Sequence, residues 1–454
     1  GAWMYAQPAR HRLSVYDEFR VTDAIGLVIM TEMRTREKNL QDFVVEACFS
    51  DIFTSTCRCL SNNTSGPVTF PITIIREKRK TSPMDYARGT IIYLTPEKRA
   101  FMQEIIVNLH MHTRYSDGFV SHDQIARAAM KAGLDAVIVT DHNVWVNGPE
   151  DTYRQGERKV LLLVGEEVHD QGRDPQKNHL LVFGARRELA TYAYDPHLLL
   201  EQVNQAGGMG FIAHPYDAAS PAVGETDITW EDWELRGFHG LEVWNWFSEF
   251  KGHLKSKLHA IYYAYHPASS GCGADPHALR KWDELLGQGR KVVAIAGSDA
   301  HALPARLGPL RRTLFPFEFH FRTVNMHLLL PRPLTGETAE DAGSIYQALR
   351  AGHGFIGYDL PASTRGFRLT VHGKEKIGGM GDEFSAHGGV TMQIRLPLRA
   401  ECAVIKDGQP VKTFHNRELY TYITAEPGVY RVEAYIHYRG RRRGWIYSNP
   451  VYIR

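Results

Sequence analysis

The sequence predicts an α/β fold, a seven-stranded (β/α) barrel in the middle of the chain, flanked by N- and C-terminal all-β sandwich-like domains. Three observations predict it. Apolar strand-like runs alternate with helical segments in the central part, short strands separated by polar turns fill both ends, and 454 residues are too many for one ordinary domain. We expect an N-terminal β domain at 1–103, the barrel at 104–362 and a C-terminal β-sandwich domain at 363–454.

The N-terminal region contains short apolar or alternating runs of the kind found in antiparallel sandwiches. Polar turns, such as the one at 61–66, separate these runs. The predicted strands are 13–16, 26–30, 42–49, 68–75 and 90–94.

The central region differs, because its strand-like runs alternate with helices. One helix is expected from the N-cap Ser121 to Gly133, and two more begin at Asp195-Pro196 and Asp275-Pro276, where an acidic cap precedes proline. Strands linked by helices favour a parallel sheet or a closed α/β barrel. The seven predicted strands are 105–109, 136–140, 160–165, 179–184, 209–213, 241–244 and 292–297.

The C-terminal region returns to short strands punctuated by glycine-rich turns. Asp407-Gly408 is a strong hairpin signal, because both residues tolerate the positive φ of a tight turn. The predicted strands are 367–373, 390–396, 402–408, 418–424, 428–436 and 445–453.

Composition and charge exclude several classes of protein. With 43% hydrophobic and 23% charged residues the chain is typical of soluble globular proteins, and a net charge of +2 argues against general attraction to nucleic acid or membranes. No apolar run approaches the roughly 20 residues that span a bilayer, so we expect no membrane partner. The basic runs at 76–80 and 439–443 fit solvated hairpin ends, so we expect no nucleic-acid partner either.

The cysteines are odd in number and scattered, which argues against a disulfide framework. A reducing compartment fits them best, so we expect a cytoplasmic protein. A periplasmic or secreted location would follow if a signal peptide had been removed ahead of Gly1. The oligomeric state stays open. The five cysteines are Cys48, Cys57, Cys59, Cys272 and Cys402.

Histidine and carboxylate residues gather where the central strands end. His110 and His112 follow the first strand at i and i+2, so their side chains point the same way. In an α/β barrel the carboxyl ends of the strands meet at one mouth, which carries the chemistry. Five of the six groups lie at such ends, whereas His179 begins its strand. The candidate metal ligands are His110, His112, Asp117, His142, Glu167, His179, His214, Asp299 and His301. Isolated histidines such as His169, His197 and His253 are expected to be structural.

The residue types indicate which metals would bind. Imidazole and carboxylate without thiolate suit zinc, manganese or iron. At roughly three or four protein ligands per ion, nine candidates supply two or three divalent metal ions. Three ions would leave the site positive and two would leave it near neutral, because the ligand set contains only three carboxylates. A positive site favours an anionic, phosphate-like transition state.

Seven ordered motifs carry a resemblance to a known family. HMH, YSDG, TDHN, GEEV, NHLLVFG, AHP and SDAH resemble the motifs of the PHP (polymerase and histidinol phosphatase) superfamily over about residues 104–360. The resemblance implies a distorted seven-stranded (β/α) barrel with a two- or three-metal site. The C-terminal segments PGVYRVEAYI and WIYSNPVYIR resemble the tail of PHP proteins grouped with carbaryl hydrolase.

The resemblance also assigns the candidate ligands to ions. His110, His112, Glu167 and Asp299 would hold one ion. Glu167 would bridge to a second ion, held also by His179 and His214, and Asp117, His142 and His301 would hold a third. The family's carboxylate matches Glu167, whereas Glu166 stands where a small or apolar residue is usual.

The first functional hypothesis is a phosphoesterase that cleaves a small, anionic phosphate ester with a metal-bridging hydroxide as nucleophile. Asp141 would orient a neighbouring ligand, and Arg306 would assist at the mouth. Arg173 and Lys177 are further cations near the site, although each of these three cations, Arg306 included, is more readily explained as a surface charge.

Two other hypotheses remain. A metal-dependent hydrolase of an aromatic ester, carbamate or amide would use the aromatic insert at 244–267, whose helical spacing equally fits core packing. A non-catalytic binding module would use the metals only to stabilise the fold. The aromatic side chains in question are Trp244, Trp246, Phe247, Phe250, Tyr262, Tyr263 and Tyr265.

Overall fold

The computed structural model describes residues 19–20, 56–59, 68–71, 102–222, 224–307 and 310–454. The chain divides into two compact units, residues 1–100 and 101–454. In the first unit, β1 (Phe19–Arg20), β2 (Thr56–Cys59) and β3 (Val68–Pro71) pair antiparallel in that order. β3 lies within the predicted strand 68–75. The other strands predicted before residue 102, the basic run at 76–80 and Cys48 lie outside the described residues.

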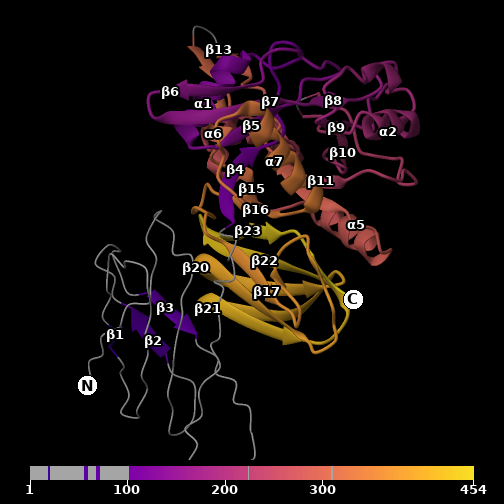
Figure 1. Ribbon diagram of the computed structural model, residues 1–454. Helices are drawn as coiled ribbons and strands as arrows, with labels where there is room; N and C mark the ends of the chain where they lie inside the picture. The colour runs from indigo at the N-terminus through magenta and orange to yellow at the C-terminus, as the bar shows by residue number, and fades with distance from the viewer. Residues whose placement is uncertain (1–18, 21–55, 60–67, 72–101, 223, 308–309) are drawn as a thin grey trace, which may run out of the picture. The chain divides into compact units, whose positions relative to one another are not determined.

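The second unit contains all seven strands that the sequence predicts for the barrel (Figure 1). The third of them is interrupted at Gly165, so that it comprises β7 and β8. The barrel strands are β4 (Gln103–Asn108), β5 (Ala136–Val139), β7 (Arg158–Val164) with β8 (Glu166–Val168), β9 (Leu180–Phe183), β10 (Met209–Ile212), β11 (Gly240–Asn245) and β12 (Val293–Gly297).

These strands form a ring made of two sheets. β4, β5 and β7 pair in parallel within one sheet, and β8 to β12 form the other. Isolated parallel bridges join Met111 to Ala300 and His142 to Glu167, so the two sheets meet at both ends. β9 runs antiparallel to both β8 and β10, which corrects the expectation of parallel strands throughout. The reason is that β8 and β9 are joined by residues 169–179 without a crossover helix, and a short connection between adjacent strands makes them antiparallel.

The helices begin where the sequence predicts. α1 (His122–Ala132) starts with a capping box at Ser121 and ends at Gly133 in the left-handed conformation. Asp195 and Asp275 accept hydrogen bonds from the first backbone amides of α2 (Pro196–Gln205) and α5 (Pro276–Gly287). The other helices are α3 (Trp246–Gly252), α4 (Lys257–Tyr265), α6 (Phe317–His320) and α7 (Thr338–Ala351). None of the helices in the described residues is long and apolar enough to cross a membrane.

The sheet that contains β4 continues into the C-terminal region. β15 (Val324–Leu330) pairs with β4, β16 (Gly354–Tyr358) pairs with β15, and β23 (Arg441–Ser448) pairs with β16. Hydrogen bonds therefore cross the boundary expected at residue 362, and buried apolar side chains from both sides form one cluster. The α/β part thus carries a large additional β-sheet region at its C-terminus.

The predicted C-terminal strands are present, with one difference. Segments 390–396 and 402–408 belong to a single long strand, β20 (Val390–Lys406), which pairs with β17 (Arg368–His372) through its first half and with β22 (Gly428–Tyr438) through its second. The hairpin at Asp407-Gly408 is confirmed, since both residues have positive φ (48° and 79°). The remaining strands are β6 (Asp151–Gln155), β13 (Pro304–Leu307), β14 (Leu310–Thr313), β18 (Ile377–Gly378), β19 (Glu383–Phe384), β21 (Gln409–Thr424) and β24 (Val451–Ile453).

Candidate metal centre

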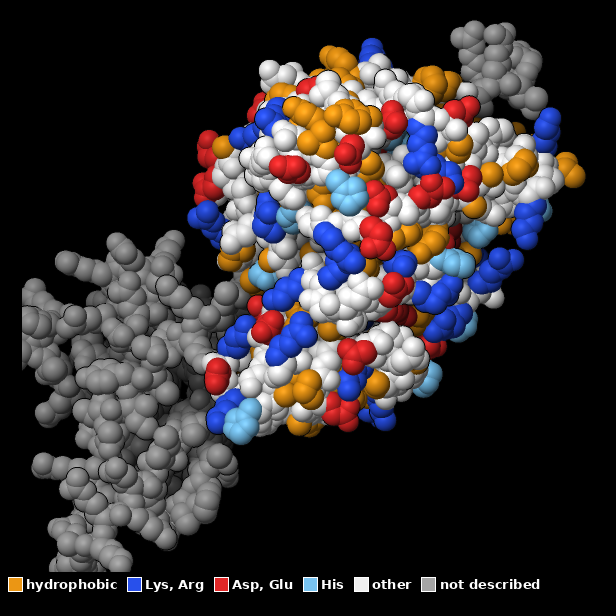
Figure 2. Space-filling view, turned by 90° about the vertical axis from the view of Figure 1, so that its right-hand side faces the viewer, with side chains coloured by type: hydrophobic (Ala, Val, Ile, Leu, Met, Phe, Trp, Pro, Cys, Tyr) orange, Lys and Arg blue, Asp and Glu red, His pale blue; other side chains and the backbone are white. Residues whose placement is uncertain are grey.

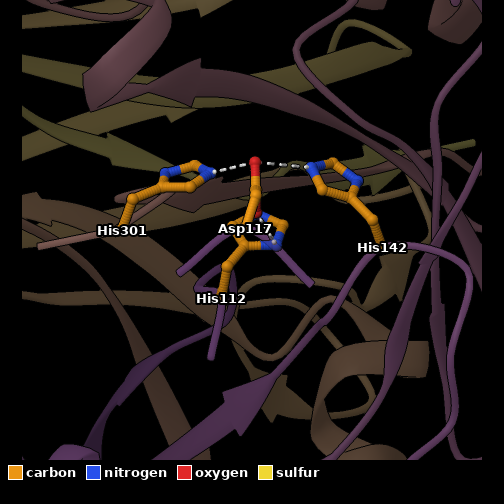
Figure 3. Close-up of side chains that lie close together, drawn as sticks. All are labelled: His112, Asp117, His142 and His301. Carbon is orange, nitrogen blue, oxygen red and sulfur yellow. Dashed lines mark ion pairs between the residues drawn. The ribbon is translucent and has the colours of Figure 1, made fainter. Parts of the chain in front are cut away.

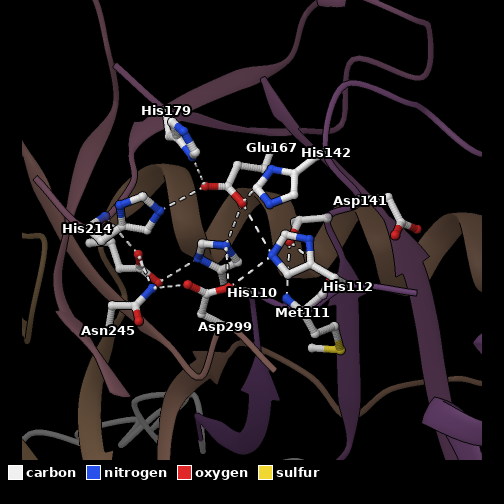
Figure 4. Close-up of polar contacts among 12 residues, drawn as sticks. His110, Met111, His112, Asp141, His142, Glu167, His179, His214, Asn245 and Asp299 are labelled. Carbon is white, nitrogen blue, oxygen red and sulfur yellow. Dashed lines mark hydrogen bonds and ion pairs between the residues drawn. The ribbon is translucent and has the colours of Figure 1, made fainter. Parts of the chain in front are cut away.

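The nine candidate ligands converge on one end of the barrel. Three overlapping groups have donor atoms within 4.8 Å of one another: His112, Asp117, His142 and His301; His110, His112, Glu167 and Asp299; and His142, Glu167 and His179. His214 joins them through Glu167, its Nε2 lying 2.9 Å from Oε1. Figure 4 shows most of these side chains pointing toward one another from the surrounding strand ends.

Glu167 lies at the centre of the cluster and contacts five imidazoles. Its Oε2 is 2.9 Å from His110 Nε2 and 3.3 Å from both His112 Nε2 and His142 Nδ1. Its Oε1 is 2.7 Å from His179 Nδ1 and 2.9 Å from His214 Nε2. The two carboxylate oxygens therefore face two different sets of histidines, which is the arrangement expected of a bridging carboxylate.

Glu166 points away from the cluster. Its Oε2 accepts a hydrogen bond from the Leu189 amide at 3.4 Å. Burial, reinforced by a hydrogen bond with Glu188, raises the pKa of Glu166 to about 10, so this carboxyl is neutral at pH 7. Of the two adjacent glutamates, the structure thus places Glu167 among the imidazoles.

Backbone pairing positions the first two histidines. The Asp299 amide donates to His110 O and the His112 amide donates to Ala300 O, so the end of β4 is joined to the end of β12. Asp299 Oδ1 consequently lies 3.0 Å from His112 Nε2 and 3.6 Å from His110 Nε2. Both imidazoles are fully buried.

The antiparallel direction of β9 explains why His179 reaches the site. His179 precedes β9, and only a strand that runs against its neighbours brings its amino end to the mouth where theirs bring their carboxyl ends. His169, which we expected to be structural, stacks on His179 with ring centroids 4.3 Å apart and so lies beside the cluster.

Asp117 forms the open side of the cluster. Its Oδ2 is 3.2 Å from His301 Nε2 and 3.7 Å from His142 Nε2, and its Oδ1 is 3.8 Å from His112 Nδ1 (Figure 3). The Asp117 side chain is 55% exposed and that of His142 is 21% exposed, whereas the carboxylates of Glu167 and Asp299 are almost inaccessible. Solvent therefore reaches the cluster past Asp117 and His142.

Asp141 contacts the loop that carries Asp117. Its carboxylate accepts hydrogen bonds from the Thr113 amide at 2.6 Å, the Thr113 hydroxyl at 2.7 Å and the Ser116 hydroxyl at 2.7 Å. We expected it to orient a ligand imidazole. The contacts instead place it where it fixes the 113–117 loop, and a catalytic role for it stays a prediction.

The donor set fits divalent metal ions. Among the described buried side chains, His112 Nδ1, His142 Nδ1 and His214 Nδ1 have no hydrogen-bond partner, an uncommon state for buried nitrogen. Burial alone would lower the pKa of His112, but Asp299 and Glu167 raise it to about 10. Burial would raise the pKa of Glu167, whereas His110, His142 and His179 hold it well below its usual range. The carboxylates thus require positive charge, which protons or metal ions supply.

Sequence reasoning missed Glu242 and Asn245. Glu242 Oε1 lies 3.0 Å from His110 Nδ1, and Asn245 donates to Asp299 Oδ2 at 3.3 Å. The signal was present, because Glu242 is the one carboxylate in the apolar segment 241–244. A single acidic residue in a strand also fits an exposed edge, so its direction could not be predicted.

Several other predicted residues lie elsewhere. The Arg306 side chain falls outside the described part of the chain. Arg173 and Lys177 both pair with Glu231, so their charges are neutralised locally. Trp244, Trp246 and Phe250 are buried in the core, as helical spacing indicated, and Tyr262 and Tyr265 are exposed. Of the seven aromatic side chains of the insert, Phe247 packs next to a candidate ligand, its ring 5.4 Å from that of His301.

Comparison with known proteins finds one protein family and one individual protein that match part of this chain. Residues 108–255 match the model of the PHP domain family. An uncharacterised protein of Methanocaldococcus jannaschii is 25% identical over 149 residues, which are 30% of this chain and 80% of the relative.

Two solved structures also resemble the chain. A two-domain Bacteroides vulgatus protein containing a predicted PHP-like metal-dependent phosphoesterase is 16% identical, with 78% of this chain and 97% of that chain covered and a TM-score of 0.37. An amidohydrolase from Chromobacterium violaceum, solved with sulfate and no metal, is 18% identical, with 46% and 92% covered and a TM-score of 0.23. Likeness at this level assigns no activity.

The matched segment contains seven of the nine candidate ligands, from His110 to His214, while Asp299 and His301 follow it in the chain. None of these matches supports the narrower resemblance to carbaryl hydrolase. The similarity to the PHP domain family thus rests on residues 108–255 of this chain.

Proposed function

We propose that the protein is a metal-dependent hydrolase that cleaves a small phosphate ester. The observation that carries the proposal is the position of Glu167, whose two oxygens face two sets of imidazoles, His110, His112 and His142 on one side and His179 and His214 on the other. One carboxylate shared in this way joins two cation positions, as in hydrolases that use paired ions.

The arrangement supports two or three divalent ions, and zinc, manganese and iron suit its donors. The group around Glu167 and Asp299 forms the buried part of the site, and the group around Asp117 forms the exposed part. His112 belongs to both groups, which places the exposed position next to the buried one. When bound, such ions lower the pKa of water toward neutrality and offer positive charge to a phosphoryl oxygen.

The surrounding residues favour an anionic substrate bound by the ions themselves. Lys251 is buried near the mouth, but its ammonium lies 2.7 Å from Asp217 and is already paired. Lys177 and Arg173 are paired with Glu231. Because these three cations are paired, we infer that a phosphate would draw mainly on the charge of the ions held by the nine ligands. Figure 2 shows acidic and basic side chains interspersed on the face in view, which supports a small-molecule partner over a nucleic acid.

Phe247 is the observation behind a second candidate function, the hydrolysis of an aromatic ester, carbamate or amide. Its ring packs 5.4 Å from that of His301 on the solvent-facing side of the cluster, where it would contact the leaving group of a bound substrate. An aromatic ester, carbamate or amide would gain from that contact. The same ring would equally accept an aryl phosphate. The assay therefore compares aromatic substrates that differ in the bond to be cleaved, a phosphate ester against a carboxyl ester or carbamate.

The proposal is tested with protein loaded in turn with Zn²⁺, Mn²⁺ and Fe²⁺ and with its metal content measured by plasma emission. We expect hydrolysis of p-nitrophenyl phosphate or its diester, and little of p-nitrophenyl acetate or a naphthyl carbamate. A His110→Ala, His112→Ala variant should lose bound metal and activity. His197→Ala, which removes an exposed histidine paired with Asp232, is the matched control and should retain both.

Three results would contradict the proposal. Turnover confined to the carboxyl substrates would favour the second candidate. Bound metal without turnover of any substrate would favour a non-catalytic module. Full activity in the His110→Ala, His112→Ala variant would exclude the cluster as the active site.

A further inference from the structure

Glu242 is a buried carboxylate that contacts the metal centre without belonging to the predicted ligand set. It is 1% exposed. Its Oε1 accepts from His110 Nδ1 at 3.0 Å, while its Oε2 accepts from the His214 amide at 2.9 Å and from Asn245 Nδ2 at 3.0 Å. One side chain on β11 therefore connects residues at the ends of β4 and β10.

An irregularity in β11 brings Glu242 and Asn245 to the same face. Glu242 pairs with Ile295 and Asn245 pairs with Gly297. Glu242 and Asn245 are three positions apart in β11, whereas their partners are only two positions apart in β12. The register shift at Val243 is a β-bulge, which inserts one extra residue. Ile295 and Gly297 share a face of β12, so their partners share it too, and both polar side chains point at the cluster.

Gly297 provides the space for this contact. A Cβ at that position would lie 2.4 Å from His110 Cβ and 2.5 Å from Glu242 Oε1. Any larger residue would push the imidazole and the carboxylate apart. The absence of a side chain on β12 at this point is therefore a condition for the hydrogen bond between Glu242 and His110.

We propose that Glu242, held by Asn245, is a positioning residue that fixes the tautomer and orientation of His110. With Glu242 Oε1 accepting from Nδ1–H, the lone pair of His110 is on Nε2, the atom that faces Glu167 Oε2 at 2.9 Å. A carboxylate behind a metal-binding imidazole also makes it a stronger donor. The inference rests on the proposed metal centre and assigns to it a residue outside the nine ligands.

Asn245 extends the same support to Asp299. Its amide group donates to Glu242 Oε2 at 3.0 Å and to Asp299 Oδ2 at 3.3 Å, and its Oδ1 accepts from the Ser248 amide as the N-cap of α3. Two candidate ligands of one ion, His110 and Asp299, are thus fixed from behind by two adjacent side chains. Their orientation does not depend on the loops at the open side.

The chemistry explains why a carboxylate is needed at position 242. Three donors point at it: an imidazole N–H, a backbone N–H and an amide N–H. A carboxylate accepts from all three, whereas the amide of glutamine has one accepting oxygen and turns its own N–H groups toward at least one donor. Glu242→Gln conserves the shape and removes this pattern.

The test measures metal affinity by competition with a chelator, together with the Co²⁺ absorption spectrum, in wild type and three variants. We expect Glu242→Gln to weaken the affinity for one ion about 10- to 100-fold and to change the Co²⁺ spectrum. Asn245→Ser keeps an N-cap but removes the amide N–H bonds to Glu242 and Asp299, and it should weaken the affinity at least about fivefold. Asp341→Asn is the matched control, because Asp341 is a buried carboxylate with three donors from Thr335 and Gly336, and it should bind metal like wild type.

The outcomes separate this inference from the proposed function. Wild type that binds no divalent ion overturns both. Wild type that binds ions, with unchanged affinity and spectrum in Glu242→Gln, overturns the inference alone. If Glu242→Gln does not fold, the test relies on Asn245→Ser. Metal affinity and a Co²⁺ spectrum equal to those of wild type in Asn245→Ser also overturn the inference. Equal weakening in Asp341→Asn would show a general loss of rigidity and likewise overturn it.

Discussion

Two buried clusters of histidine and carboxylate in the described part of residues 101–454 differ in how their polar atoms are satisfied. The first is the metal cluster of the nine candidate ligands. The second, which we call the His327 network, consists of Glu104, His327, Asp359, Thr364 and Arg368, where β4, β15 and β17 meet. Both contain fully buried imidazoles between carboxylates.

The His327 network satisfies its own groups. His327 Nδ1 lies 2.7 Å from Glu104 Oε1, and its Nε2 lies 3.1 Å from Asp359 Oδ2. Arg368 Nη1 lies 2.5 Å from Glu104 Oε2. One guanidinium and one protonated imidazole thus balance two carboxylates, and no atom of the network is among the described buried atoms that lack a partner.

In the metal cluster, by contrast, the carboxylates have no lysine or arginine to balance their charge among the described residues. Four carboxylates, those of Asp117, Glu167, Glu242 and Asp299, contact its imidazoles, and in the described part of the chain no lysine or arginine pairs with any of them. Ring nitrogens of three of its histidines have no hydrogen-bond partner. A buried group of His with Asp or Glu is therefore not by itself evidence of a metal site. Ring nitrogens without a hydrogen-bond partner, and carboxylates without a lysine or arginine partner in the described residues, distinguish the metal cluster from the His327 network.

The largest expected effect is on metal binding in Glu167→Gln. Glu167 contacts five imidazoles, so its loss removes a donor from both sets. Changes behind a ligand cost about 10- to 100-fold, so loss of a shared ligand should lower activity at least about 1,000-fold. Steady-state kinetics and metal analysis check this expectation.

Glu166→Gln is the control for that variant. Because burial raises the pKa of Glu166 to about 10, glutamine replaces a carboxyl that is already neutral at pH 7. Metal content and activity should stay close to wild type. Equal losses in the two variants would mean that the segment, and not the Glu167 carboxylate, determines metal binding.

Glu104→Gln should have the next largest effect, and on stability alone. The substitution leaves Arg368 and His327 without their shared carboxylate in a buried place. Breaking a buried ion pair from one side costs about 3–5 kcal/mol. Urea denaturation measures the loss, and plasma emission should find the same metal content as in wild type. A drop in bound metal would contradict the separation of the two clusters.

The His327 network also predicts a dependence of stability on pH. Burial alone would lower the pKa of His327, but Asp359 and Glu104 raise it to about 8. Because this folded-state pKa exceeds the unfolded value of about 6.5, the stabilisation is complete below pH 6.5 and is lost as the pH rises through 8, about 2 kcal/mol in all. The free energy of unfolding of wild type minus that of His327→Gln, measured with urea at pH 6 and pH 9 under constant free metal, should shrink by that amount. A difference that is independent of pH would show that His327 stays neutral.

The central part of the fold could be predicted because its strands and caps are local features. Seven apolar runs and the caps Ser121, Asp195 and Asp275 determine strands and helix starts within a few residues of themselves. The direction of β9 could not be predicted, since it depends on the loop before it and on its partners. The pairing of β16 with β23 also joins residues distant in sequence, and no local pattern marks it.

In the candidate site, too, local features could be predicted from the sequence and features that depend on distant contacts could not. Eight of the nine ligands follow the carboxyl ends of strands, so one topological rule brings them together, whereas His179 precedes β9 and reaches the cluster because that strand is antiparallel. Glu242 needs a β-bulge to face the cluster together with Asn245, and a bulge leaves no mark in the residue types of segment 241–244. The pairing of Lys177 with Glu231 likewise joins residues that no motif connects.

The smallest expected effect concerns a third cluster, which tests the comparison most directly. Glu249, His253 and Cys272 have donor atoms close enough to hold an ion, with Cys272 Sγ 3.9 Å and Glu249 Oε1 3.8 Å from His253 Nε2. Their polar atoms nevertheless have partners, because His253 Nε2 donates to Ser270 O at 3.0 Å and Trp244 Nε1 donates to Glu249 Oε2 at 2.8 Å.

Arg443 adds a positive charge at this place, its Nη1 lying 3.7 Å from Cys272 Sγ. By the criterion of unpartnered donors and missing charge, the third cluster should hold no ion. Cys272→Ala should therefore leave metal content and activity unchanged and alter stability by no more than about 1 kcal/mol. If plasma emission found one ion fewer per chain in this variant, partnered donors would also bind metal, and the distinction between the metal cluster and the His327 network would rest on geometry alone.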